Sequence, residues 1–148
     1  VDRGRRPQYR RRQHRGGLEE AQRQHGVIWI DAHGDWNSEE STCTGNMHGM
    51  PFSAVCGYGP DCMVEFGQGA APVNVAHCVQ VGGRDIDDLE RQRMAQAGVT
   101  VFPINMIDKL GMGAVIERAI QIAGEGTDGI HLSFDVMPSL RRLCRARE

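Results

Sequence analysis

Short apolar segments that alternate with helical patterns are the feature that most restricts how this chain can fold. Val27-Ile28-Trp29-Ile30 is a continuous apolar run, as expected for a strand that is buried on both faces. Three further segments have the character of strands, at 79–82, 99–102 and 130–134. Helical spacing and stop signals predict helices over 50–55, 86–97 and 110–123. Alternating strands and helices predict an α/β fold with a parallel sheet and crossover helices.

The net charge of -2 conceals a strong division along the 148 residues. Residues 1–26 carry a net charge of +5 and residues 138–148 a net charge of +3, whereas residues 27–137 carry -10. Residues 1–16 lack apolar periodicity and are predicted to form a solvated arm, followed by a short helix over 17–25. Arginine clusters can bind nucleic acid or anionic membranes. No folded recognition motif accompanies them here, so we do not expect nucleic acid as a partner.

Hydropathy and cysteine usage narrow the class of protein further. No apolar run approaches the ~20 residues that span a bilayer, and the N-terminal segment does not look like a secretory signal. The five cysteines are an odd number without a CxxC pair, which argues against a disulfide scaffold and against a cysteine zinc site. We therefore expect reduced thiols, a cytoplasmic location and no membrane partner.

The ends of the predicted strands carry acidic side chains and one histidine. In a parallel sheet, ligands bind outside the carboxyl ends of the strands. Asp31, His33 and Asp35 follow the first strand at alternate positions, so an extended backbone would point them the same way. Carboxylates with one imidazole suit Mn²⁺ or a similar ion, and Asp135 at another strand end is the natural fourth ligand. The alternative is a set of loop carboxylates or helix caps beside a surface histidine.

A second polar segment, Thr44-Gly45-Asn46-Met47-His48-Gly49, lies in a predicted loop. Its glycines would let the backbone approach a ligand closely. Asn46 offers a polar side chain, and His48 could transfer protons near neutral pH. An ordinary surface histidine is the alternative for His48.

Three blocks of sequence in family-like order together resemble the arginases of the ureohydrolase superfamily. The first contains Asp31-Ala-His33-Gly-Asp35-Trp-Asn37 and then Gly45-Asn46-Met-His48-Gly49-Met-Pro51. The second is Val81-Gly-Gly-Arg84-Asp85-Ile-Asp87, and the third is Ile130-His-Leu-Ser-Phe-Asp135-Val136. The loop sequence favours arginase over agmatinase and formimidoylglutamase. The resemblance covers residues 27–136.

The resemblance implies a three-layer α/β fold, incomplete in this chain, and a binuclear manganese centre. In that chemistry a metal-bridging hydroxide attacks the guanidinium carbon of L-arginine and gives ornithine and urea. By position, Asp31, His33, Asp35 and Asp135 match metal ligands. Substrate positions are matched by Asn37 and Thr44 for the α-carboxylate and by Asp87 for the α-amino group, with Asn46 in the same loop. His48 matches the proposed proton shuttle, and a homotrimer or homohexamer is implied.

The chain also departs from the family pattern. A Gly-Gly-Asp-His segment has no counterpart upstream, a later Glu and the remaining strands are absent, and Asp135-Val136-Met137 replaces Asp-Val-Asp. These departures coincide with the Arg-rich ends, which suggests truncation with frameshifts at both junctions. The predicted organisation is a non-family segment at 1–26, a partial arginase-like domain at 27–136 and a non-family tail at 137–148. A diverged terminus is the alternative, and the DNA sequence across both junctions distinguishes the two.

The sequence therefore predicts arginase chemistry with an incomplete second metal site, and a chain that is inactive or nearly so. Agmatine or another guanidino compound is the alternative substrate. A non-catalytic metal-binding relic or subunit partner is the alternative of a different class.

Overall fold

Four parallel strands form the sheet at the centre of the fold. The computed structural model describes residues 24–65 and 71–135. The strands are β1 (His25–Ile30), β2 (Cys78–Val81), β3 (Thr100–Phe102) and β4 (Gly129–Phe134), in the spatial order β3-β2-β1-β4. Each strand pair is parallel. The four predicted strands are confirmed, with ends that differ by at most two residues.

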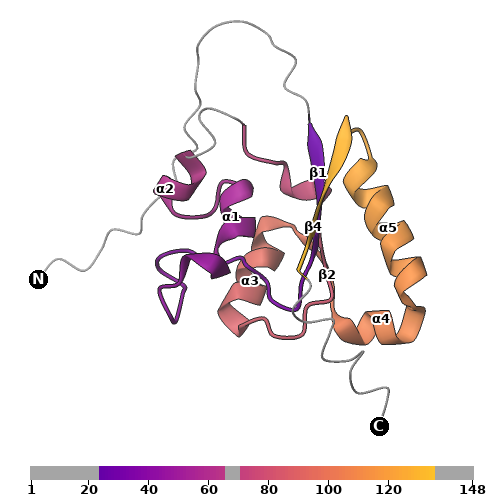
Figure 1. Ribbon diagram of the computed structural model, residues 1–148, viewed down its shortest axis with the longest axis horizontal. Coiled ribbons are helices and arrows are strands. Elements are labelled where there is room, and N and C mark those ends of the chain that lie inside the picture. Colours follow the sequence, from indigo (N-terminus) through magenta and orange to yellow (C-terminus); the bar gives the residue numbers. More distant parts are fainter. Residues whose placement is uncertain (1–23, 66–70, 136–148) are drawn as a thin grey trace, which may run out of the picture.

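Helices cover both faces of this sheet. On one side in Figure 1 lie α1 (Pro51–Val55), α2 (Asp61–Val64) and α3 (Asp88–Ala97), and on the other lie α4 (Ile104–Leu110) and α5 (Met112–Gly124). The short 3-10 helices η1 (Met47–Gly49) and η3 (Val75–His77) lie in connecting segments. The predicted three-layer α/β architecture is therefore confirmed. Within the described ranges, no helix combines the length and the apolar character needed to cross a membrane.

Glycines set the ends of the two longest helices. Gly98 ends α3 with a φ of 92°, and its N–H donates to the carbonyls of Met94 and Ala95. Gly111 has a φ of 83° and separates α4 from α5. The helix predicted over 110–123 therefore begins at Met112.

Three other segments differ from the prediction. Residues 104–110 form α4, which the sequence pattern did not indicate. Residues 60–78, whose Gly and Pro content predicts a loop with some strand, contain α2 and η3. The short helix predicted over 17–25 is wrong at its C-terminal end, because His25 already begins β1. The rest of that helix lies outside the described residues, as do the Arg-rich segments apart from residues 24–26.

Apolar residues on the two faces of the sheet form separate core clusters. Val27, Phe52, Cys78 and Met94 belong to the cluster under α1 and α3. The opposite cluster, under α4 and α5, is made by Ile28, Val79, Val81, Ile107, Val115, Ala119 and Ala123. Adjacent residues of β1 thus face opposite layers, as the uninterrupted apolar run predicts. On β4, by contrast, Ile130, Leu132 and Phe134 are exposed.

Gly26 lies where β1 and α5 approach each other most closely. A Cβ atom at this position would be 1.9 Å from the backbone oxygen of Ala123. Gly26→Ala should therefore force the strand and helix apart and lower the free energy of unfolding by about 1–3 kcal/mol. Gly113→Ala is the control, because its Cβ would enter open space within α5 and should add about 0.5–1 kcal/mol. Urea unfolding of both variants measures the difference, and equal midpoints would contradict it.

Candidate metal and substrate site at the carboxyl edge of the sheet

The carboxyl ends of β1, β2 and β4 lie side by side at one edge of the sheet. Ile30 pairs with Val81 of β2 and with Phe134 of β4, so the three strands end at the same level. Beyond these pairs, the N–H of Asp31 donates to the carbonyl of Val81 at 3.0 Å. The N–H of Asp135 likewise donates to the carbonyl of Ile30 at 3.0 Å. The parallel register thereby brings residues about 100 positions apart in sequence to one place.

Asp31, His33 and Asp135 form a cluster of three metal-ligand side chains at this edge. Their ligand atoms all lie within 4.8 Å of one another. Asp31 is buried, Asp135 is half-buried and His33 is exposed, so the cluster opens toward solvent. One Asp31 carboxylate oxygen accepts from the backbone N–H of His33 at 3.0 Å and lies 3.2 Å from its Nδ1. The donor set of two carboxylates and an imidazole is suitable for Mn²⁺.

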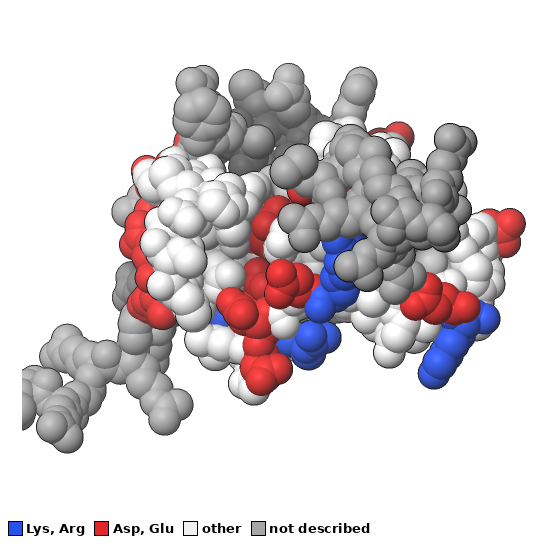
Figure 2. All heavy atoms as spheres, turned by 60° about the horizontal axis from the view of Figure 1, so that its bottom comes forward, with Lys and Arg blue, Asp and Glu red and all other residues white. Residues whose placement is uncertain are grey.

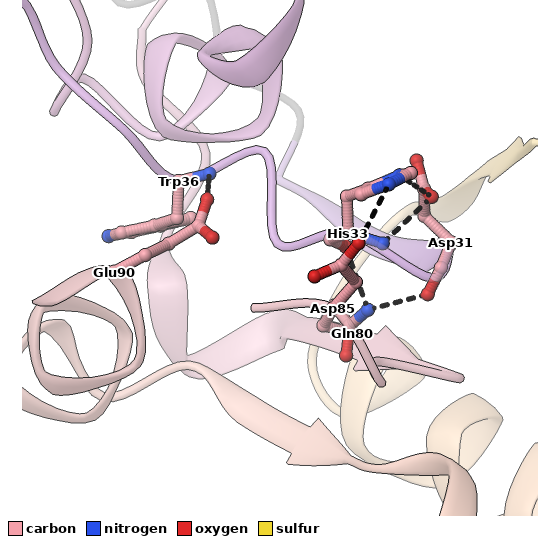
Figure 3. Close-up of polar contacts among 6 residues, drawn as sticks. All are labelled: Asp31, His33, Trp36, Gln80, Asp85 and Glu90. Atoms are coloured by element: carbon pink, nitrogen blue, oxygen red, sulfur yellow. Dashed lines mark hydrogen bonds and ion pairs between the residues drawn. The ribbon is translucent and has the colours of Figure 1, made fainter. Parts of the chain in front are cut away.

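The other ring nitrogen of His33 faces the end of β2. Its Nε2 lies 3.8 Å from an oxygen of Asp85, whose side chain is 83% exposed. A parallel bridge pairs His33 with Asp85, and the N–H of Asp85 donates to the carbonyl of Ala32 at 2.9 Å. Figure 3 shows the imidazole between the carboxylates of Asp31 and Asp85. Carboxylate oxygens therefore lie near both ring nitrogens of His33.

Gln80, in the middle of β2, supports this segment from below. Its side chain is fully buried, and its Nε2 donates to the carbonyl of Asp31 at 2.8 Å and to that of His33 at 3.1 Å. Figure 3 shows the amide beneath the backbone that carries both side chains. Sequence analysis did not single out Gln80. The available signal was a polar residue between Val79 and Val81, because a buried amide requires hydrogen-bond partners.

Glu90 of α3 binds the continuation of the same segment. It is buried, and its Oε1 accepts from the backbone N–H of Trp36 at 2.7 Å and from the side-chain amide of Asn37 at 3.2 Å. Burial raises the pKa of Glu90, and the backbone hydrogen bond from Trp36 opposes this shift. The helical spacing of Ile86, Leu89 and Met94 in the sequence predicts that Leu89 faces inward, but Leu89 is exposed. The carboxylate of Glu90 satisfies backbone and side-chain donors at this position, which a leucine could not do.

Asp35 lies in the same segment but outside the three-residue cluster. Its φ of 50° places it in the left-handed region, which interrupts the extended alternation that the sequence predicted for positions 31, 33 and 35. Burial, followed by the negative charge of Asp31, raises the pKa of Asp35 to about 7. A positive charge near this segment would therefore favour its ionised form.

This pKa implies a pH dependence for the stability of the metal-free chain. The folded-state pKa of Asp35 is raised from 3.8, so its contribution to stability is fully present below about pH 4 and is lost as the pH rises through about 7. Asp35→Asn removes the ionisation and keeps a side chain that tolerates a positive φ. Urea unfolding in a chelator at pH 5 and pH 8 should show the variant gaining stability relative to the parent at the higher pH. Parallel pH profiles would contradict the prediction.

The predicted substrate residues lie in different environments. Asn37 is half-buried, and its side chain is bound by Glu90 and by the Ser41 hydroxyl at 2.9 Å. The other predicted contacts are exposed: Thr44, Asn46, His48 and Asp87. The backbone N–H of Asn37 donates to the carbonyl of Gly49 at 3.0 Å and so ties the loop that carries His48 to the strand-end segment.

Acidic side chains outnumber basic ones where the chain leaves the carboxyl end of β2. Asp85 and Asp87 are exposed between β2 and α3, Asp88 is exposed at the start of α3, and Arg84 is the exposed basic residue beside them. Figure 2 brings this part of the molecule forward and shows Asp and Glu side chains gathered near the middle of the face, with Lys or Arg side chains beside them. A field of this sign attracts metal cations and cationic organic groups such as guanidinium.

Comparisons with known proteins agree on one family. The sequence model of the Arginase family matches residues 13–137. The arginase of Brevibacillus brevis is 42% identical over 111 residues, which are 75% of this chain and 37% of that protein. The chain thus spans just over a third of the length of the curated relatives it matches.

Solved structures show the same likeness. The crystal structure of the Bacillus cereus arginase superposes with a TM-score of 0.71 at 43% identity, and the match covers 76% of this chain and 38% of that one. The Entamoeba histolytica arginase, solved in complex with L-ornithine, matches with a TM-score of 0.69 at 34% identity over 80% of this chain and 39% of that one.

Proposed function

The chain belongs to the arginase family, and from this premise we propose that it carries part of a manganese-dependent site for hydrolysing the guanidinium group of L-arginine to ornithine and urea. The convergence of Asp31, His33 and Asp135 at the carboxyl edge is the observation that carries the proposal. The relatives that support it are named arginases, and one of them was solved with L-ornithine bound.

Asp31, His33 and Asp135 would hold a manganese ion, and Asp35 would contribute its carboxylate from the adjoining segment. When bound, manganese acts as a Lewis acid and lowers the pKa of water, which produces a nucleophile at neutral pH. The residues of the chain fit this role because their oxygens and imidazole nitrogen match the preference of the ion. The negative charge of Asp31 raises the pKa of Asp35, so the two carboxylates are electrostatically coupled.

The substrate side of the site would be formed by the exposed residues around the cluster. Asp87 would attract the α-amino group, while Thr44, Asn46 and Asn37 would receive the α-carboxylate. His48 is exposed on the loop that Asn37 anchors, so it can exchange protons with solvent and with a bound substrate. The acidic surface near the edge would concentrate the cationic substrate beside the cluster.

We further propose that the 148-residue chain alone turns over arginine slowly or not at all. Met137 stands where the family pattern has a second carboxylate, so the donor set for a second ion is incomplete. Clustered carboxylates repel one another when the second metal ion is absent. This repulsion disfavours the ionised carboxylates that the reaction needs.

Manganese titration of the purified chain, with urea production assayed in parallel, tests these proposals. Asp31→Asn and Asp135→Asn should each weaken Mn²⁺ binding by at least about tenfold, since each removes a charged ligand. Asp61→Asn, at an exposed position of α2, is the matched control and should bind like the parent chain. Equal affinity in all four proteins would overturn the metal site.

The activity assay distinguishes the substrate alternatives. Arginine and agmatine differ only in the α-carboxylate, so a comparison of the two reports on the Thr44 and Asn46 loop. Arginine turnover at a rate like that of full-length arginases would contradict the proposed inactivity. Manganese binding without urea from either compound would support a non-catalytic metal-binding role.

A further inference from the structure

Two thiols meet in the core cluster under α1 and α3, away from the acidic edge. Cys56 follows the last residue of α1, and Cys78 is the first residue of β2. Their sulfur atoms lie 3.5 Å apart, and both residues are buried, with exposed fractions of 4% and 0%. Cys43 and Cys62, the other two cysteines in the described ranges, are exposed. The proposed arginine chemistry makes no use of the buried pair.

The two sulfurs are in contact but are not bonded. They lie 3.5 Å apart, whereas a disulfide bond needs sulfurs about 2.05 Å apart. Cys56 precedes Gly57, whose φ of 79° marks a turn after α1. Cys78 also contacts the carbonyl of Asn74 through its sulfur at 3.5 Å, a weak interaction that a disulfide would replace.

We propose that Cys56 and Cys78 form a modification site, at which a peroxide joins α1 to β2 through a reversible disulfide bond. One thiolate attacks the peroxide O–O bond and becomes a sulfenic acid, releasing water after proton transfer. The second thiol then attacks the sulfenic sulfur, forms the S–S bond and releases a second water. In total, two thiols and one hydrogen peroxide give one disulfide and two waters, and an external dithiol reverses the oxidation.

The environment of the two thiols makes this reaction slow in the folded protein. The hydrogen bond with Cys78, followed by burial, raises the pKa of the Cys56 thiol well above its usual range. Thiolate is the reactive form, so little of it is present near neutral pH. Oxidation should therefore accelerate under conditions that expose the two thiols to solvent.

The disulfide would constrain the connection that leads from α1 to β2. Residues 56 and 78 enclose the segment that contains α2 and η3. Cross-linking a loop of this length removes conformational freedom from the unfolded chain. The bond also fixes the C-terminal end of α1, the helix whose N-terminal end follows the loop carrying Asn46 and His48. The oxidised chain should therefore be more stable, with the loop anchored more firmly.

The test uses the full chain in a background that leaves only this pair: Cys43→Ser, Cys62→Ser and Cys144→Ser. After hydrogen peroxide treatment and removal by catalase, we expect loss of both thiols in denaturant and a mass decrease of two hydrogens in the monomer. Dithiothreitol should restore both. The urea midpoint of the oxidised form should exceed that of the reduced form by about 1 M or more.

Two control variants keep the outcome interpretable. Adding Cys56→Ala or Cys78→Ala to the background removes one partner, so peroxide should then add oxygen or leave the remaining thiol free, without the two-hydrogen loss. The proposal is overturned if the two-cysteine chain gains oxygen, forms only intermolecular disulfides or keeps both thiols. It is also overturned if the disulfide forms only in urea concentrations that unfold the chain.

Discussion

Replacing Phe52 with alanine is expected to lower the free energy of unfolding by about 3–5 kcal/mol. The Phe52 ring on α1 is fully buried; it stacks on Trp29 with centroids 5.0 Å apart and meets Trp36 edge-on at 4.9 Å. Its removal leaves a cavity between two large rings that cannot close it without moving β1 or the segment that follows. Urea unfolding under reducing conditions measures the loss.

The control for this variant is Val55→Ala on the same helix. Val55 is exposed, so its truncation should change stability by no more than about 0.5 kcal/mol. If the two variants lost equal stability, the aromatic cluster would not be the contact that holds α1 on the sheet. Trp36 directly follows Asp35, so Phe52→Ala should also broaden the NMR signals of the strand-end segment.

Replacing Gln80 with methionine is expected to weaken Mn²⁺ binding by roughly 10–100-fold while the chain stays folded. Methionine fills a similar volume but cannot donate to the carbonyls of Asp31 and His33. The backbone that carries both ligands then loses two hydrogen bonds and becomes less ordered. Ordering it on metal binding costs free energy, which lowers the affinity. Calorimetric titration with Mn²⁺ at a temperature where both proteins are folded measures the change.

Gln92→Met on the exposed side of α3 is the matched control for this experiment. It makes the same chemical change away from the cluster and should leave Mn²⁺ affinity unchanged. A Gln80→Met chain that unfolds more easily but binds Mn²⁺ as tightly as the parent would show that Gln80 serves stability alone. A fall in affinity without a matching fall in stability supports a positioning role.

The sequence predicts the location of the candidate site because one rule connects strand ends to ligand positions. Val27 to Ile30 is apolar without interruption, which predicts a strand buried on both faces. The residues that follow it therefore lie at the carboxyl edge of the sheet. Asp31 and His33 are those residues, and Asp135 occupies the corresponding place after β4. The structure brings the three together. Their role as ligands stays a prediction.

Tertiary contacts decide the features that the sequence did not predict. The helical pattern of α3 favours Leu89 for the buried face, but Glu90 is buried instead because its carboxylate accepts from the N–H of Trp36. The orientation of the Asp35 side chain depends on a positive φ, which is uncommon for residues other than glycine and is not visible in the sequence. The role of Gln80 depends on which backbone carbonyls lie next to β2, and the sequence pattern does not show this. Each case depends on a partner that is distant in sequence.

The central position of β1 has a consequence for how the chain reaches its native state. One edge of β1 pairs with β2, about 50 residues later, and the other pairs with β4, 104 residues later. Contacts of such long range form slowly, because the intervening chain must lose entropy before they are made. During synthesis, β1 therefore emerges long before its second neighbour exists. Until β4 has been synthesised, the apolar residues of β1 lack their second neighbour. A chaperone that recognises short hydrophobic segments would therefore bind β1 during synthesis.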